Sequence, residues 1–99
     1  MAKYDVHPNP GAQGYLLDVQ TDLLDGLNTR VVVPLLPEYR APKPAGTLNP
    51  VFEIDGERCV MVTQLLSAVA ASVLTTRAAD LSGRAGEITR AMDMLLQGF

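Results

Sequence analysis

The spacing of hydrophobic residues changes its period once along this chain, and that change limits the fold more than any other feature. Through residues 15–21 apolar and polar positions alternate, which is the pattern of a half-buried strand. From residue 82 to residue 97 apolar residues recur every three or four positions, which is typical of an amphipathic helix. The sequence therefore predicts a mainly β (α+β) fold, a strongly curved antiparallel sheet or barrel closed by one carboxyl-terminal helix.

Turn residues predict how some of the strands pair. Asp55-Gly56 separates two alternating runs, residues 51–54 and 57–63, and predicts a two-residue hairpin turn because both turn positions need positive φ. The run at residues 30–36 is too rich in β-branched side chains to be anything but a strand. Pro34 cannot donate a backbone hydrogen bond, so we expect the end of this strand to lie near an edge or a bulge.

The remaining strands are predicted less directly. Residues 8–14 form a loop with two prolines and two glycines, so residues 4–7 and 15–21 are expected to pair as a wide hairpin. Residues 64–71 fit either a helical turn or a strand, and residues 72–75 are predicted as the last strand.

The ends of the terminal helix have their own signals. Asp80 or Ser82 is expected to cap its first turn, and Gly98 stands where a left-handed carboxyl-terminal cap is wanted. Glu87 and Arg90 are three residues apart, so we expect them to pair across one turn of the helix.

Length and composition exclude several classes of protein. Ninety-nine residues form one small domain, and 47% hydrophobic against 19% charged residues excludes a disordered tail. The formal net charge of −3 argues against direct binding of nucleic acid, which normally requires a basic face. The chain has neither a signal-peptide pattern nor an apolar run of about 18 residues, so we expect a cytoplasmic protein that does not enter membranes.

The residues that carry enzyme chemistry are scarce. One histidine and one cysteine cannot form a His/Cys metal cluster, and the glycines match neither a phosphate loop nor a dinucleotide fingerprint. His7 precedes a proline and is interpreted as a surface or turn residue, and Cys59 as a small buried hydrophobic residue. We therefore expect no catalytic residues, no metal and no cofactor.

Five further segments of the chain form a recognisable series. They are Asp18-Val19-Gln20-Thr21-Asp22-Leu23-Leu24-Asp25, Arg30-Val31-Val32-Val33-Pro34-Leu35, Leu48-Asn49-Pro50-Val51-Phe52-Glu53-Ile54, Met61-Val62-Thr63 and Ala79-Asp80-Leu81-Ser82. Together these segments resemble one family, the CcdB toxins of toxin–antitoxin pairs, whose order and spacing they keep from about residue 15 to residue 99.

The resemblance implies a single toxin domain over residues 1–99 with an SH3-like barrel and a terminal helix. It also implies a non-enzymatic inhibitor that acts as a homodimer and binds the A subunit of DNA gyrase, trapping the enzyme on cleaved DNA. A CcdA-like antitoxin would neutralise the toxin, and pairs of this kind regulate their own transcription. The antitoxin contacts are not assigned, although the loop of residues 8–14 is a candidate by analogy.

The family's gyrase-binding positions can be carried over residue by residue. Leu23 and Leu24 follow the Asp-Val-Gln-Thr-Asp run, Asp93 stands at the family's polar position on the last helix, and Gln97-Gly98-Phe99 is the closing tripeptide. Toxic members typically end Trp-Gly-Ile and carry asparagine at the position of Asp93. A flexible glycine before an apolar end residue suits insertion into a partner's groove.

Other interpretations remain open. Phe99 could fold back on Met94, and Leu23 and Leu24 could be core or dimer-interface residues. The missing tryptophan leaves a non-toxic or retargeted homologue that binds only antitoxin as an alternative. An endoribonuclease of the same barrel fold, like the MazF toxins, is a further alternative, against which stands the lack of a basic RNA groove.

Overall fold

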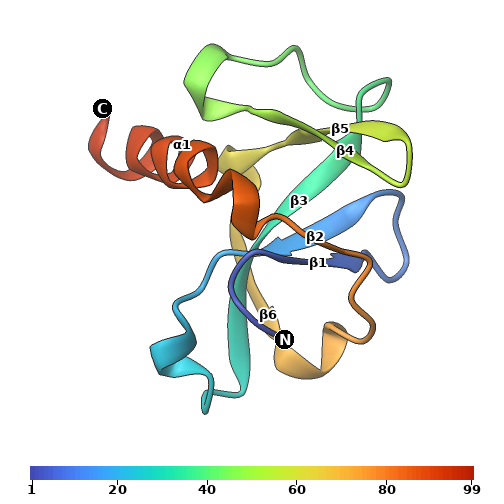
Figure 1. Cartoon of the computed structure of the whole chain (residues 1–99), viewed down its shortest axis with the longest axis vertical. Coiled ribbons are helices and arrows are strands. Elements are labelled where there is room, and N and C mark those ends of the chain that lie inside the picture. The colour runs from blue at the N-terminus through green and yellow to red at the C-terminus, as the bar shows by residue number, and fades with distance from the viewer.

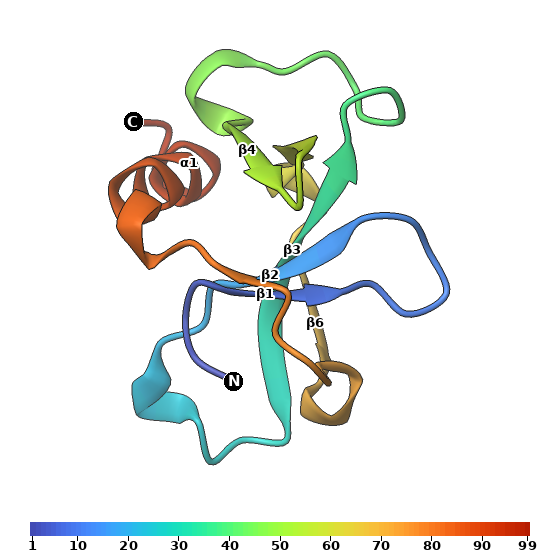
Figure 2. The ribbon, with the colours of Figure 1, turned by 45° about the vertical axis from the view of Figure 1, so that its right-hand side comes forward.

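A long central strand, β3 (Thr29–Pro37), organises the sheet in the computed structural model, which describes all residues 1–99 (Figure 1). Along one side it pairs with β2 (Tyr15–Asp18). Along the other side its first half pairs with β6 (Ser67–Ala70) and its second half with β5 (Glu57–Met61). This change of partner lets the sheet curl strongly around β3, as Figure 2 shows.

The seven strands form one antiparallel sheet in the order β4-β5-β3-β2-β1-β7, with β6 joined to β3. The outer strands of this order are β4 (Val51–Ile54) and β7 (Ala79–Asp80), and β1 (Asp5–Pro8) lies between β2 and β7. Helix α1 (Ala85–Gln97) follows and packs beside the open end of this nearly closed barrel (Figure 1). The predicted mainly β, SH3-like barrel with one carboxyl-terminal helix is confirmed.

Five short 3₁₀ turns fill the connections between these elements. They are η1 (Asp22–Leu24), η2 (Gly46–Leu48), η3 (Thr63–Leu65), η4 (Ala71–Val73) and η5 (Ser82–Arg84). No helix of the chain is both long enough and apolar enough to cross a bilayer.

The predicted strand at residues 30–36 is confirmed by β3, but Pro34 lies inside this central strand of the sheet rather than near an edge, so that expectation is wrong. The amide of Val19 donates to the carbonyl of Val31 (3.1 Å), so odd positions of β3 turn their backbone groups toward β2. Pro34 therefore faces the opposite side, where pairing with β6 has stopped at Val32 and pairing with β5 begins at Leu35. The missing N–H falls in this gap between two partners and costs no ladder hydrogen bond.

Both predicted hairpins are confirmed. The β4–β5 turn has positive φ at Asp55 (51°) and Gly56 (78°), as a two-residue type I′ turn requires. β1 pairs with β2 in the register Val6 with Leu17, across the expected wide loop.

The predicted last strand at residues 72–75 is wrong. η4 occupies Ala71–Val73, β6 lies earlier, and the last strand of the chain is β7. A strand forms at residues 67–70 instead, because Val69 and Ala68 pair with Arg30 and Val31 of β3. This pairing is a long-range contact that the local pattern did not contain.

The ends of α1 agree with the sequence in part. Gly98 adopts the expected left-handed conformation (φ 82°). The predicted capping of the first turn of α1 by Asp80 or Ser82 is wrong, because Arg84 holds the cap position of α1 and makes no side-chain capping bond. The Asp80 carboxylate instead accepts a hydrogen bond from the Ser82 amide (2.8 Å) at the start of η5. Glu87 pairs with Arg84 rather than with Arg90, so that predicted pair is wrong. Arg84 takes this place because its guanidinium also lies over the ring of Phe52, 4.7 Å from the ring centre.

The main core lies between the concave face of the sheet and α1. Ile88 and Ala91 of α1 are 1% and 0% exposed and belong to one cluster with buried strand residues. Those strand residues include Leu17, Val33, Leu35, Phe52, Ile54, Cys59 and Met61. The interpretation of Cys59 as a small buried hydrophobic residue is confirmed, because it is 0% exposed.

A second, smaller cluster covers the other face of the sheet and corrects the interpretation of His7. Leu16, Val32 and Leu74 form this cluster. His7 pairs with Leu16 in the sheet and is only 2% exposed, with its Nδ1 at 2.9 Å from the carbonyl of Thr76. His7 is therefore buried rather than a surface or turn residue, because the segment that follows β6 returns over this face.

Candidate functional site

Three leucines project from one exposed turn, residues 21–28, which we call the leucine turn. Leu23 is 91% exposed, Leu24 48% and Leu27 51%. The Thr21 hydroxyl accepts a hydrogen bond from the Leu23 amide (3.3 Å), and the Asp25 amide donates to the Asp22 carbonyl (3.2 Å). These contacts close the 3₁₀ turn η1, so the interpretation of Leu23 and Leu24 as core residues is wrong.

A buried ion pair stands at the base of the leucine turn. Asp18 and Arg30 lie 2.7 Å apart, both with fully buried side chains. Arg30 also donates to the Gln20 carbonyl (3.3 Å) and to the Asp22 carboxylate (3.4 Å). Burial raises the pKa of Asp18, while hydrogen bonds from the Gln20 amide and Arg30 act in the opposite direction. Removing either member of the pair would leave a buried charge without its partner.

The carboxyl terminus forms a second exposed apolar tip. Gly98 ends α1 by donating its amide to the carbonyls of Asp93 (3.1 Å) and Met94 (3.2 Å). Phe99 beyond it is 81% exposed, so it does not fold back on Met94. The side-chain amide of Gln97 donates to the Asp93 carboxylate (3.3 Å). Asp93, predicted on the helix, and Gln97, predicted in the closing tripeptide, therefore lie in contact.

The first residues of the chain lie between the two tips. The Lys3 amide donates to the Asp22 carboxylate of the leucine turn (2.9 Å). Lys3 and Tyr4 also line a cavity of about 230 Å³ against α1, whose other wall includes Met92 and Asp93. In Figure 1 the leucine turn lies at the lower left and the carboxyl terminus at the upper left.

Three residues of this surface were not predicted from the sequence: Lys3, Tyr4 and Leu27. The exposed Leu27 could have been found, because it continues an apolar series between turn residues. Lys3 and Tyr4 carry no comparable signal. They reach α1 only because the chain turns at Tyr4, whose φ is 76°.

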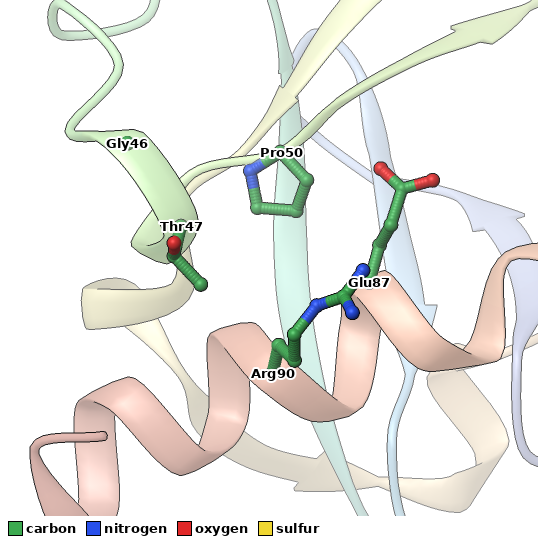
Figure 3. Close-up of a pocket in the computed structure, with 5 residues that line it drawn as sticks. All are labelled: Gly46, Thr47, Pro50, Glu87 and Arg90. Atoms are coloured by element: carbon green, nitrogen blue, oxygen red, sulfur yellow. The ribbon is translucent and has the colours of Figure 1, made fainter.

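A separate, polar pocket of about 420 Å³ lies between η2 and α1 (Figure 3). Gly46, Thr47 and Pro50 form one wall, and Glu87 and Arg90 rise from the helix on the other. Glu87 is held by Arg84, and that hydrogen bond keeps the pKa of Glu87 below its usual range. The pocket lacks a nucleophile beside a base. No group of three or more His, Cys, Asp or Glu side chains in the chain could hold a metal ion.

Fold and surface together define a small SH3-like barrel protein whose terminal helix and one sheet connection carry exposed apolar tips. The family model described as CcdB protein matches residues 3–98 of the chain. The chain belongs to the CcdB family, a family of toxins of toxin–antitoxin pairs.

Proposed function

We propose that this protein is a toxin that binds the A subunit of DNA gyrase and traps the enzyme on cleaved DNA. Membership of the CcdB family supports the proposal, since gyrase is the known target in that family. The observation that carries it is the exposed aromatic residue Phe99 directly after the left-handed Gly98. Apolar anchors of this kind supply most of the binding energy in protein interfaces.

The two apolar tips have complementary parts in this proposal. Phe99 enters a groove of the partner, while Leu23 and Leu24 form a second contact on the same molecule. Asp93 and Gln97 are hydrogen-bonded to each other and orient the base of the first tip. A homodimer would present two such sets, which suits a partner with two-fold symmetry.

The remaining parts of the proposal follow from the family. A CcdA-like antitoxin binds the toxin and releases gyrase, and both act in the cytoplasm. The toxin itself performs no catalysis and binds no nucleic acid directly.

Calorimetric titration against the gyrase A fragment tests the proposal. We expect the intact chain to bind and the chain lacking residues 97–99 to bind about 30- to 900-fold more weakly, because a central anchor contributes roughly 2–4 kcal/mol. Phe99→Ala should cause most of that loss. The matched control is Tyr39→Ala, which removes another exposed aromatic residue (73% exposed) from a different face and should leave binding unchanged. Equal binding by the intact and shortened chains would overturn the proposal.

A second candidate is a homologue that binds antitoxin without poisoning gyrase. Gln97 favours it, because this residue stands where toxic relatives carry tryptophan. Tight antitoxin binding with no gyrase complex would support this candidate. Restoration of gyrase binding by Gln97→Trp would then identify the tip as the cause. Cleavage of bare RNA by the purified protein would instead favour the endoribonuclease alternative.

A further inference from the structure

No apolar packing holds the leucine turn in place. Every residue from 21 to 29 is exposed, and η1 contains no buried residue. The direction in which Leu23 and Leu24 point therefore depends on polar contacts at the base of the turn. A side chain that is itself immobile is best able to provide such contacts, since burial restricts its rotamers.

Two buried side chains reach into the leucine turn: Arg30, which contacts only the exposed Asp22 carboxylate there (3.4 Å), and Gln20, which contacts the backbone of the turn. Gln20 is 8% exposed, and its Nε2 donates to the carbonyl of Leu24 (3.2 Å). Its Oε1 accepts from the amide of Val31 on β3 (3.1 Å), one residue pair beyond the end of the β2–β3 ladder at Asp18 and Val32. One amide group thus ties the turn to the central strand at the point where β2 leaves the sheet.

The backbone of Gln20 is fixed as firmly as its side chain. Its amide donates to the Asp18 carboxylate (3.0 Å), and its carbonyl accepts from Arg30 (3.3 Å). The buried ion pair of Asp18 and Arg30 therefore holds the backbone of Gln20 at both its N–H and its carbonyl group. Thr21 and Asp22 make the other side-chain contacts of the turn, and both are exposed, although one partner of Asp22 is the buried Arg30.

We propose that Gln20 is the positioning residue of the leucine turn: its side-chain amide sets the direction in which Leu23 and Leu24 meet the partner protein. The inference rests on the proposed function, in which these leucines contact gyrase. Gln20 itself touches no partner and acts through the turn.

The change Gln20→Glu tests this role closely. Glutamate keeps an oxygen for the Val31 amide but replaces the donor to Leu24 with a second oxygen, which repels that carbonyl. The control Gln13→Glu makes the same change of charge at an exposed side chain whose Oε1 accepts from Tyr39 (3.1 Å). If Gln20→Glu fails to fold, Gln20→Met, neutral and of similar volume, replaces it in every measurement.

The first measurement is the set of backbone NMR order parameters. In Gln20→Glu we expect those of residues 22–28 to fall from about 0.8 to below about 0.6, while those of β2 and β3 stay unchanged. Gln13→Glu should match the original chain. Unchanged order parameters across the turn in a folded Gln20 variant would overturn the inference, whether or not the chain binds gyrase.

The second measurement is affinity for the gyrase A fragment, arranged as a double-mutant cycle. Gln20→Glu should weaken binding about tenfold in the original chain and have no further effect once Leu23 and Leu24 are both alanine. The same tenfold loss with and without the leucines would show that Gln20 does not act through them. If the original chain does not bind gyrase at all, the proposed function fails, while the order parameters still decide the role of Gln20.

Discussion

At the scale of single residues, Gly14 is the position where the backbone tolerates no side chain, because the end of the wide loop lies directly against β3. It has a φ of 89° at the end of the wide loop, and an added Cβ would overlap the carbonyl oxygen of Leu35. We expect Gly14→Ala to lower the free energy of unfolding by about 2–4 kcal/mol, because backbone strain and overpacking add. Urea unfolding measures the change.

Gly11 provides the control for this prediction. Its φ of 77° is similar, but nothing lies within 4 Å of an added Cβ. Gly11→Ala should therefore cost only about 1 kcal/mol, the conformational part alone. An equal loss in the two variants would contradict the assigned clash with Leu35.

Cys59 is expected to be chemically inert in the folded protein. It is 0% exposed, and burial, followed by the nearby charge of Glu57, raises the pKa of its thiol. At pH 8 a thiol reagent should react on the order of 100-fold more slowly with the native chain than with the chain in denaturant. Equal rates under native conditions, with the protein shown to be folded, would contradict the burial of this residue.

At the scale of elements, two carboxylates hold the segment that runs from β7 through η5 into the first turn of α1. The Ser82 amide lowers the pKa of Asp80, and the hydrogen bond from Arg84 lowers that of Glu87. A folded-state pKa below the unfolded value of about 4 stabilises the fold above that pH. This stabilisation is lost as the pH falls through the folded-state pKa.

The double variant Asp80→Asn, Glu87→Gln tests this acid dependence. It should be less stable than the original chain at pH 7 and equally stable near pH 2, where both carboxylates of the original chain are protonated. The exposed Arg84–Glu87 pair should contribute less than about 1 kcal/mol of the difference. Urea unfolding at the two pH values measures it, and a difference that persisted at pH 2 would show another cause.

At the scale of the whole molecule, the amount of exposed apolar surface favours self-association. Leu65, Met94, Leu96 and Phe99 are all exposed, and three of them lie on or after α1. If the protein is the proposed homodimer, its melting temperature should fall by several degrees on roughly 100-fold dilution, because dissociation is coupled to unfolding. Light scattering should give twice the chain mass at the higher concentration. A monomer mass with a constant melting temperature would contradict the homodimer.

The candidate site could be predicted from the sequence only in part. Leu23, Leu24 and the last three residues were named from the resemblance to the family, and the structure shows how far each is exposed. Lys3, Tyr4 and Gln20 were not named, because their roles depend on contacts with the leucine turn, β3 and α1. Such contacts join segments that are far apart in the chain and leave no local pattern.

The sequence by itself determined the local structure of this protein: the alternating strands, the Asp55-Gly56 turn, the amphipathic helix and its glycine end. These features depend on side-chain period and on φ preferences, which act between near neighbours. Only the tertiary structure decided that His7 is buried, that Arg84 takes Glu87, and that β3 changes partner at Pro34. Those outcomes depend on which distant segment covers a residue or offers the better contact, and tertiary packing rather than local propensity decides that.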